Sequence, residues 1–304
     1  TLKDVAREVG LSHSAVSLAL RHHPSIPEAT RQRIEAAAKR MGYRPNPMVS
    51  ALMARRRTGS TEAGRGACTL AFLNLNPPET QPHSSALYDL YLKGARERAE
   101  TLGYRVEFFG LREKGMTPRR IQQILQTRGI RGILLPPVHD PSQTISFDWE
   151  RFSVAGLSYT SRETFALATH DHYSNMKLCL RGLLELGYRK IGFCTGRIWD
   201  ERVHGLYSAA YLHEGLTEPR LESLPICFFE QNRFADTFRQ WLRRNRPEAV
   251  ISGKGEAHFE VFADLGLRAP DDIGFATLSR LADHADFAGL DEMPEVIGAM
   301  AVDA

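Results

Sequence analysis

The N-terminal part of the chain places apolar side chains with the period of short amphipathic helices. Apolar residues recur every three or four positions in residues 2–9 and again in residues 15–20, so each segment predicts a helix with one buried stripe. Gly10 suits the left-handed end of the first helix, and Ser12 suits the N-cap of the second. A third helix is predicted from Pro27, because proline at the first helical position loses no hydrogen bond. This is the pattern of a helix-turn-helix, although any small three-helix bundle has a similar periodicity.

The second predicted helix has a short polar face opposite its apolar stripe. None of the residues on this face is acidic: His13, Ser14, Ser17, Leu18 and Arg21. Further along, residues 46–53 predict a short helix, because Asn46 can cap it and Pro47 suits its first position. Such a helix is marginal when isolated. The basic segment that follows, residues 55–61, predicts a flexible tether or simply a solvated linker.

From residue 67 onward, short apolar runs alternate with helical stretches. The predicted strands are residues 68–75, 105–109, 132–135, 166–169, 190–194, 225–228, 249–252 and 274–278, and the predicted helices are residues 87–102, 118–128, 175–186, 202–213, 234–244, 257–265 and 294–304. Strands that alternate with helices of this length predict parallel sheets covered on both faces, a doubly wound α/β fold.

The length of this α/β part predicts two lobes with a cleft between them. Roughly 240 residues exceed what one doubly wound sheet usually needs. The sequence Leu-Gly-Tyr-Arg also occurs twice, at residues 102–105 and 186–189, which is consistent with two related units. A glycine followed by an apolar residue is a recurrent helix stop, so convergence explains this echo equally well.

Charge separates the N-terminal segment from the rest of the chain. Residues 1–60 contain eleven Lys and Arg against four Asp and Glu, whereas the remaining residues contain 28 against 32. A basic segment joined to a mildly acidic body is typical of a protein that neutralises phosphate groups with the basic part. This distribution favours a DNA-binding helix-turn-helix over an unrelated three-helix bundle.

Five short motifs in the N-terminal segment occur in the order and spacing of a known family. They are LKDVA at residues 2–6, GLS at 10–12, AVS at 15–17, EATR at 28–31 and MGYRPN at 41–46. Residues 2–52 thereby resemble the DNA-binding region of the lac-repressor and galactose-repressor family of bacterial transcription regulators. The resemblance implies that the second helix enters the major groove of duplex DNA. It places His13, Ser14 and Leu18 on base edges and Ser12, Ser17 and Thr30 on phosphates, with Arg21 and Asn46 as further contacts.

One departure from the family pattern concerns base recognition. Many relatives carry arginine where this chain has Leu18, and arginine is the usual bidentate reader of guanine. We therefore expect Leu18 to pack on a thymine methyl group or to leave that base pair variable. His13 can donate to a guanine, or it is a solvated surface histidine.

The resemblance also assigns a role to the short helix after residue 46. In the family, two such helices fold together in the minor groove, where the residue that matches Leu52 wedges between base steps. Leu52 is therefore the expected wedge, with Val49 beside it. Alternatively, Met48, Val49, Leu52 and Met53 form an ordinary apolar stripe that packs on the body.

The resemblance extends more weakly over the body and implies a fold similar to periplasmic binding proteins, with a small effector between two lobes. We expect a DNA-binding domain at residues 1–45, a hinge helix and linker at 46–60, and an effector-binding domain at 61–304. Chain crossings between the lobes are expected near residues 151–161 and 287–291. Because the last helix continues further in relatives, we expect the sequence to stop within this domain.

Arg202 matches the family arginine whose planar fork holds two ligand oxygens; alternatively, it forms a surface ion pair with Glu201 or Asp200. The other expected lining residues are Ser84, Ser85, Tyr88, Ser158, Trp199, Lys254 and Ser279. Where relatives carry an acid that grips sugar hydroxyls, this chain has Ser279 and Arg280. The departure makes a sugar less expected, and Arg202, Lys254 and Arg280 instead suit an anionic ligand.

Enzymatic activity, a cofactor and a metal are not expected. His170 and His172 suit metal binding or acid-base chemistry if a strand points both the same way, but we expect a strand end before a helix capped by Ser174. No glycine-rich phosphate loop follows a strand. The four cysteines, Cys68, Cys179, Cys194 and Cys227, lack paired spacing and suit buried thiols in a reducing cytoplasm.

We therefore predict a homodimeric repressor, less readily an activator, that binds a pseudo-palindromic double-stranded DNA operator and is controlled by an unidentified small-molecule effector. We expect it in the bacterial cytoplasm, associated with the nucleoid. No apolar run is long enough to span a bilayer, so a membrane partner is not expected. The alternative is an exported solute-binding protein without a DNA-binding role. We see no export signal in the sequence, and a solute-binding protein does not need a basic helical segment at its N-terminus.

Overall fold

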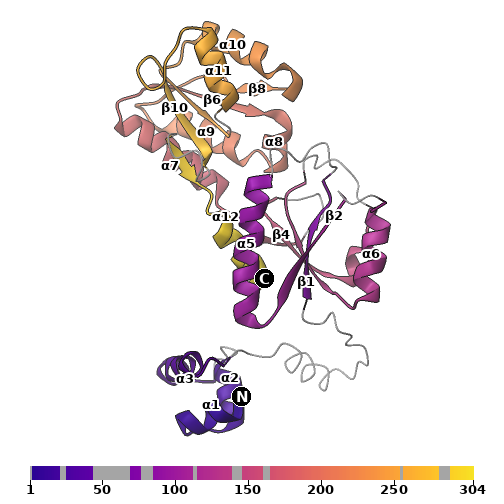
Figure 1. The fold of residues 1–304 in the computed structure, drawn as a ribbon. Coiled ribbons are helices and arrows are strands. Elements are labelled where there is room, and N and C mark those ends of the chain that lie inside the picture. Colours follow the sequence, from indigo (N-terminus) through magenta and orange to yellow (C-terminus); the bar gives the residue numbers. More distant parts are fainter. Residues whose placement is uncertain are drawn as a thin grey trace.

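The computed structural model describes residues 2–20, 25–43, 69–76, 85–111, 115–138, 146–159, 165–253, 256–280 and 288–304. A three-helix N-terminal domain is followed by two α/β lobes (Figure 1). The expected hinge helix and linker, and with them both predicted domain boundaries, lie outside the described residues. Among the residues that are described, no helix combines the length and apolar character needed to cross a bilayer.

The N-terminal domain contains α1 (Leu2–Val9), α2 (His13–Ala19) and α3 (Glu28–Arg40). Its core is built by the predicted apolar stripes, and Val5, Val16 and Ile34 are fully buried. Ser12 caps α2, because its side-chain oxygen accepts a hydrogen bond from the Ala15 amide at 3.1 Å. The predicted helix-turn-helix is confirmed, with Pro27 at the cap position of α3 rather than inside the helix.

The first lobe is a parallel five-stranded sheet in the order β2-β1-β3-β4-β5. Its strands are β1 (Thr69–Asn74), β2 (Arg105–Gly110), β3 (Gly132–Leu135), β4 (Ser153–Leu157) and β5 (Ala166–Ala168). Its helices are α5 (Ser85–Leu102), α6 (Pro118–Thr127) and α12 (Pro294–Asp303), with a short 3-10 turn at Trp149–Arg151. Alternate side chains of β1 enter two different cores: Phe72 packs on the side of α5 and α12, and Leu73 on the side of α6.

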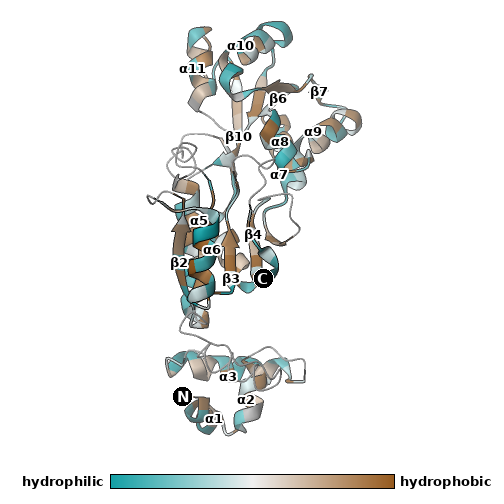
Figure 2. Ribbon diagram, turned by 90° about the vertical axis from the view of Figure 1, so that its right-hand side faces the viewer, coloured by the Kyte–Doolittle hydropathy of each residue, from teal (hydrophilic) through white to brown (hydrophobic). Residues whose placement is uncertain are grey.

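The second lobe has the same construction. Its strands are β6 (Lys190–Gly196), β7 (Glu222–Ser223), β8 (Cys227–Phe229), β9 (Ala249–Ser252), β10 (Gly274–Arg280) and β11 (Gly289–Asp291), all paired in parallel. One face is covered by α7 (His172–Glu185) and α9 (Leu206–Thr217), and the other by α10 (Phe234–Asn245) and α11 (Glu256–Asp264). The short helix α8 (Arg197–Arg202) and a 3-10 turn at Gln231–Arg233 complete the lobe. Figure 2 shows apolar strands between amphipathic helices in both lobes, as the sequence pattern predicts.

Two sequence predictions about the body are wrong. Residues 151–161, expected to cross between the lobes, contain β4, which pairs with β3 and β5 inside the first sheet. The chain instead crosses after β5, at residues 169–171, and returns after β11, at residues 292–293. The single helix expected at 202–213 is two helices, α8 and α9, because His204 and Gly205 have positive φ angles of 56° and 69°.

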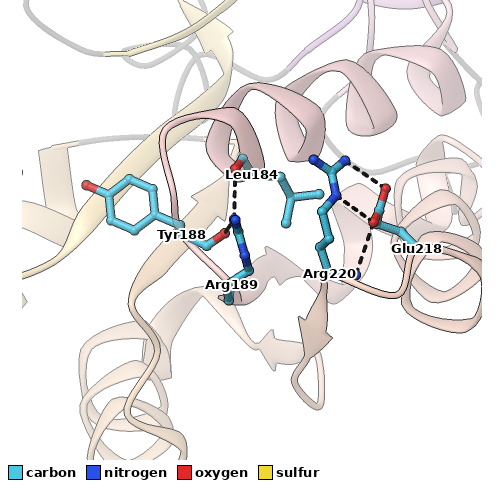
Figure 3. Close-up of polar contacts among 5 residues, drawn as sticks. All are labelled: Leu184, Tyr188, Arg189, Glu218 and Arg220. Atoms are coloured by element: carbon cyan, nitrogen blue, oxygen red, sulfur yellow. Dashed lines mark hydrogen bonds and ion pairs between the residues drawn. The ribbon is translucent and has the colours of Figure 1, made fainter.

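The repeated Leu-Gly-Tyr-Arg motif is a local helix stop. Gly103 and Gly187 both adopt positive φ, and the amide of the following tyrosine donates back to a helix carbonyl in each case. In the second copy, the Arg189 guanidinium also donates to the Leu184 carbonyl at 2.8 Å (Figure 3). The helix stop therefore explains the repeated motif, and the evidence for two lobes is the presence of two separate sheets.

Helices α5 and α12 approach closely through glycine. A Cβ atom at Gly298 of α12 would overlap the backbone carbonyl of Tyr91 in α5, whereas a Cβ at Gly182, on the exposed side of α7, would meet no atom within 4 Å. The contact joins the element after the second crossing to the first lobe, so it fixes how the chain returns to that lobe.

We expect Gly298→Ala to destabilise the protein by about 1–3 kcal/mol, because backbone atoms must separate to admit the methyl group. Gly182→Ala is the matched control and should stabilise the protein by up to about 1 kcal/mol, because alanine favours a helix interior. Urea denaturation followed by circular dichroism measures both variants. Equal effects would contradict the close approach of α5 and α12.

Candidate functional site

Helix α2 carries the described part of the predicted DNA-contacting surface. Ser12 and His13 are exposed, and Ser17, Leu18 and Thr30 are partly buried. Val16 and Ala19, on the opposite side of α2, are fully buried in the core. The remaining predicted contacts lie outside the described residues: the Ser14 side chain, Arg21, Asn46, Val49 and Leu52.

The acidic groups of this domain lie on α1 and α3, and three of them pair with arginines. Asp4 lies 3.7 Å from Arg7, Glu8 lies 3.8 Å from Arg40, and Glu28 pairs with Arg31. Helix α2 itself has no acidic residue. An anionic backbone can therefore approach α2 without meeting a carboxylate on that helix.

A second candidate site lies at the carboxyl ends of the strands, where the chain crosses between the lobes. Parallel strands end at the same edge of a sheet, which is where ligands bind in open α/β folds. Ser158 follows β4, is buried, and has a positive φ of 64°. Its amide donates to the Ala168 carbonyl at 2.7 Å, which ties the end of β4 to the end of β5. Such a conformation in a residue other than glycine is strained and is often found at functional sites.

Two histidines flank the first crossing. Nε2 of His170 lies 2.9 Å from Nε2 of His172, and the Tyr207 hydroxyl lies 3.5 Å from the same atom of His170. Burial lowers the pKa of both imidazoles, and the neighbouring His170 lowers that of His172 further, to about 3. At neutral pH the pair is therefore uncharged, and one Nε2 donates its proton to the other.

Arg202, the last residue of α8, lies beside this pair. Its positive charge lowers the pKa values of His170 and His172, and it also acts on Tyr91 of α5 in the first lobe. Its Nε atom is buried and has no hydrogen-bond partner among the described residues. An unsatisfied buried donor costs about 1–3 kcal/mol, more when it is charged.

The ion pair considered from the sequence does not form. Asp200 is buried and accepts a hydrogen bond from the Ser208 hydroxyl at 2.7 Å. Within the described part of the chain, no carboxylate lies within ion-pair distance of Arg202. The guanidinium is thus held between the lobes without a counter-charge in contact.

Other predicted lining residues are engaged within one lobe. The hydroxyl of Tyr88 donates to the Pro137 carbonyl, the Trp199 ring packs edge-on against Phe229, and the Ser279 amide donates to the Thr277 hydroxyl at 3.2 Å. Ser84, the Ser85 side chain and Lys254 lie outside the described residues.

Sequence reasoning missed three residues that surround the pair. Tyr91 lies one turn after Tyr88 on α5, a spacing that identifies it in retrospect. Tyr207 packs its ring against His172 with centroids 5.0 Å apart, and Glu292 of the second crossing raises the pKa of His170. Glu292 has no motif that signals it, because only the return of the chain brings it to the first crossing.

The structure also corrects the local prediction around residue 174. Asp171, not Ser174, is the N-cap of α7, and its carboxylate accepts from the Ser174 amide at 2.9 Å and from the Ser174 hydroxyl at 2.7 Å. These hydrogen bonds lower the pKa of Asp171.

Among the described residues, no three His, Cys, Asp or Glu side chains gather closely enough to hold a metal ion. The thiols of Cys179, Cys194 and Cys227 are buried and free, and Cys68 lies outside the described residues.

The depressed pKa of His172 predicts acid sensitivity. The folded protein favours the neutral imidazole, whereas the unfolded chain binds a proton below a pH of about 6.5. Stability is therefore retained above that pH and falls as the pH drops toward about 3, the pKa of His172 in the folded state. We expect His172→Gln to lose less stability than the parent between neutral pH and the onset of acid unfolding, as measured by urea denaturation. His213→Gln, an exposed control, should keep the parental pH dependence; equal slopes for all three proteins would contradict this account.

Comparison with known proteins extends these observations. The family model described as "Bacterial regulatory proteins, lacI family" matches residues 1–46. The ribose operon repressor of Escherichia coli is 26% identical over 294 residues, covering 90% of this chain and 81% of that protein. The ribose operon repressor of Lactococcus lactis is 23% identical over 216 residues, covering 70% of this chain and 60% of that protein.

Solved structures share the fold of the whole chain. A "transcriptional regulator CelR-cellobiose complex" gives a TM-score of 0.59 at 18% identity and covers 100% of this chain and 91% of that one. The lac repressor dimer bound to operator and the anti-inducer ONPF gives a TM-score of 0.58 at 17% identity, with coverage of 100% and 90%. An N-terminal helix-turn-helix followed by two parallel-sheet lobes is thus the architecture of these regulators as well.

The family match over the helix-turn-helix, the repressors that align along most of the chain and the shared two-lobed fold agree with the sequence motifs: residues 1–46 match the LacI family of bacterial regulatory proteins, and the rest of the chain resembles regulators of that family in sequence and fold.

Proposed function

We propose that this chain is a homodimeric DNA-binding transcriptional regulator, a repressor rather than an activator, whose affinity for its operator is set by a small molecule bound between the lobes. The observation that carries the proposal is the surface of α2, which is polar and free of acids and belongs to a domain in which Asp4, Glu8 and Glu28 pair with arginines. The relatives named above are operon repressors, and one solved relative is a dimer on operator DNA. We place its action on nucleoid DNA in the bacterial cytoplasm, with no catalytic step.

The position of the second site suggests how a ligand acts on DNA binding. His170 lies in the first crossing between the lobes and Glu292 in the second, so a ligand there contacts both connections. A ligand that binds one arrangement of the lobes better than another shifts the population toward it. One solved relative is a complex with cellobiose, which supports a small molecule as the controlling ligand.

Selection from a random duplex library tests DNA binding directly. We expect a pseudo-palindromic consensus, bound with an affinity whose logarithm falls linearly with the logarithm of salt concentration, by about 0.9 per contacted phosphate. Fluorescence anisotropy with the selected duplex measures this slope. Failure to bind duplex DNA at low ionic strength, or binding without salt sensitivity, would refute the proposal.

Leu18 offers a test of which helix face reads the bases. Leu18→Arg should create a preference for guanine at one symmetric pair of operator positions, worth about 1–3 kcal/mol per contact. Leu178→Arg makes the same change at an exposed leucine of α7 and should leave the consensus unaltered. An unchanged consensus in both variants would show that α2 is not the reading helix.

Leu52 tests the proposed wedge, although it lies outside the described residues. Leu52→Ala should lower operator affinity and reduce the bend of the bound DNA, because an apolar wedge holds base steps apart. Electrophoresis of circularly permuted operator fragments measures the bend. Met53→Ala is the comparison: if the stripe only packs on the body, both variants change thermal stability and neither changes the bend.

A further inference from the structure

Three buried polar atoms between the lobes have no hydrogen-bond partner among the described residues: Nε of Arg202, Nδ1 of His170 and Nδ1 of His172. Protein interiors rarely leave such atoms unsatisfied. His170 lies in the first crossing, His172 begins α7 and Arg202 ends α8, and the charge of Arg202 acts on both imidazoles. Their convergence points to a ligand that supplies the missing partners.

The balance of charge at this place indicates what kind of ligand it is. Arg202 is a cation with no carboxylate in ion-pair contact within the described part of the chain, and the two imidazoles are neutral at physiological pH. The hydroxyl of Tyr207 adds a neutral donor beside His170. Two acids act on the same groups: Glu292 on His170 and Tyr207, and Asp171 on both imidazoles. The cluster therefore offers the guanidinium, the Tyr207 hydroxyl and one imidazole N–H as donors, and the other imidazole Nδ1 as an acceptor. Of the two carboxylates, that of Asp171 already accepts from Ser174.

We propose that the ligand of this site is a small hydroxylated organic oxyanion, whose carboxylate or phosphate binds Arg202 and whose hydroxyl donates to Glu292. The proposal rests on the proposed function, since it names the class of the controlling ligand. An oxyanion matches the planar guanidinium with two parallel hydrogen bonds. A neutral polyol would supply no counter-charge to this partly buried guanidinium.

The strand end that faces such sites in α/β folds supports the same choice. β10 ends in Ser279 and Arg280, so it contributes a hydroxyl and a cation there and no acid. The Ser279 amide and carbonyl are held by the Thr277 side chain at 3.2 Å and 3.3 Å. We assign the ligand hydroxyl to Glu292 at the second crossing, because the Asp171 carboxylate already accepts from Ser174.

Matched pairs of compounds test the proposal on the full chain. The probes are glucose 6-phosphate with glucose, galacturonate with galactose, and inorganic phosphate alone, studied by calorimetric titration up to about 10 mM. We expect at least one charged compound to bind about tenfold or more tightly than its neutral partner. The phosphate and carboxylate pairs distinguish the two sources of the oxyanion.

Two arginines of α8 supply the variants. Arg202→Gln should remove binding of the charged compound, whereas Arg197→Gln should keep it, because Arg197 is exposed and lies 3.6 Å from Glu230. Glu292→Gln should strengthen binding of inorganic phosphate and weaken binding of the hydroxylated oxyanion, each severalfold, since it removes a repulsive charge and replaces a charged hydroxyl acceptor with a weaker neutral one.

Three results would overturn the proposal: equal binding of neutral and charged partners, undiminished binding to Arg202→Gln, or no binding of any charged compound. The second result would place the anion elsewhere, for example on the basic N-terminal domain. Operator binding by the same preparations separates this outcome from failure of the proposed function. If the parent and Arg202→Gln both bind selected DNA while no oxyanion binds, the proposed DNA-binding function is retained and the proposed ligand class is wrong.

Discussion

The parallel direction of every described strand pairing is the constraint on which the candidate site depends. In each lobe, the carboxyl ends of the strands lie at one edge, and the segments that leave those ends must turn there. The two crossings leave the ends of β5 and β11, so each carries its polar residues to such an edge. His170 and Glu292 are far apart in sequence and act on each other electrostatically because of this topology alone.

The return of the chain to the first lobe links this site to the packing of that lobe. After Glu292 the chain enters α12, which lies against α5 so closely that Gly94 and Gly298 have no room for a side chain. Tyr91, on α5, provides the backbone carbonyl that Gly298 approaches, and its side chain lies within the field of Arg202. A movement of the second crossing is therefore transmitted to the first lobe through the backbone contact of α12 with α5 rather than through flexible side chains.

Much of this architecture was predictable from the sequence, and the misses share a physical cause. Periodicity located the helices and most strands, because the burial of one face or of both faces of an element sets the spacing of apolar residues along it. The strand β4 was taken for a connection, since a single short strand does not reveal which sheet it joins. Arg202 was identified through a motif, and the His170–His172 pair through its spacing, although as a metal or catalytic candidate. Glu292 and Tyr207 were missed because their proximity to the pair is set by tertiary structure and by no local pattern.

The unsatisfied atoms between the lobes bear on how such a protein switches. A buried guanidinium nitrogen and two imidazole nitrogens, which find no partner in the described part of the chain, raise the free energy of this arrangement relative to one in which water reaches them. A ligand that forms hydrogen bonds with all three nitrogens stabilises this arrangement. It cannot form these hydrogen bonds together once the lobes move apart. That difference in affinity between two arrangements is what a population shift requires, and tight binding by itself does not supply it. The same polar groups that make the ligand-free site costly are thus the ones that give a ligand control over the relative position of the lobes.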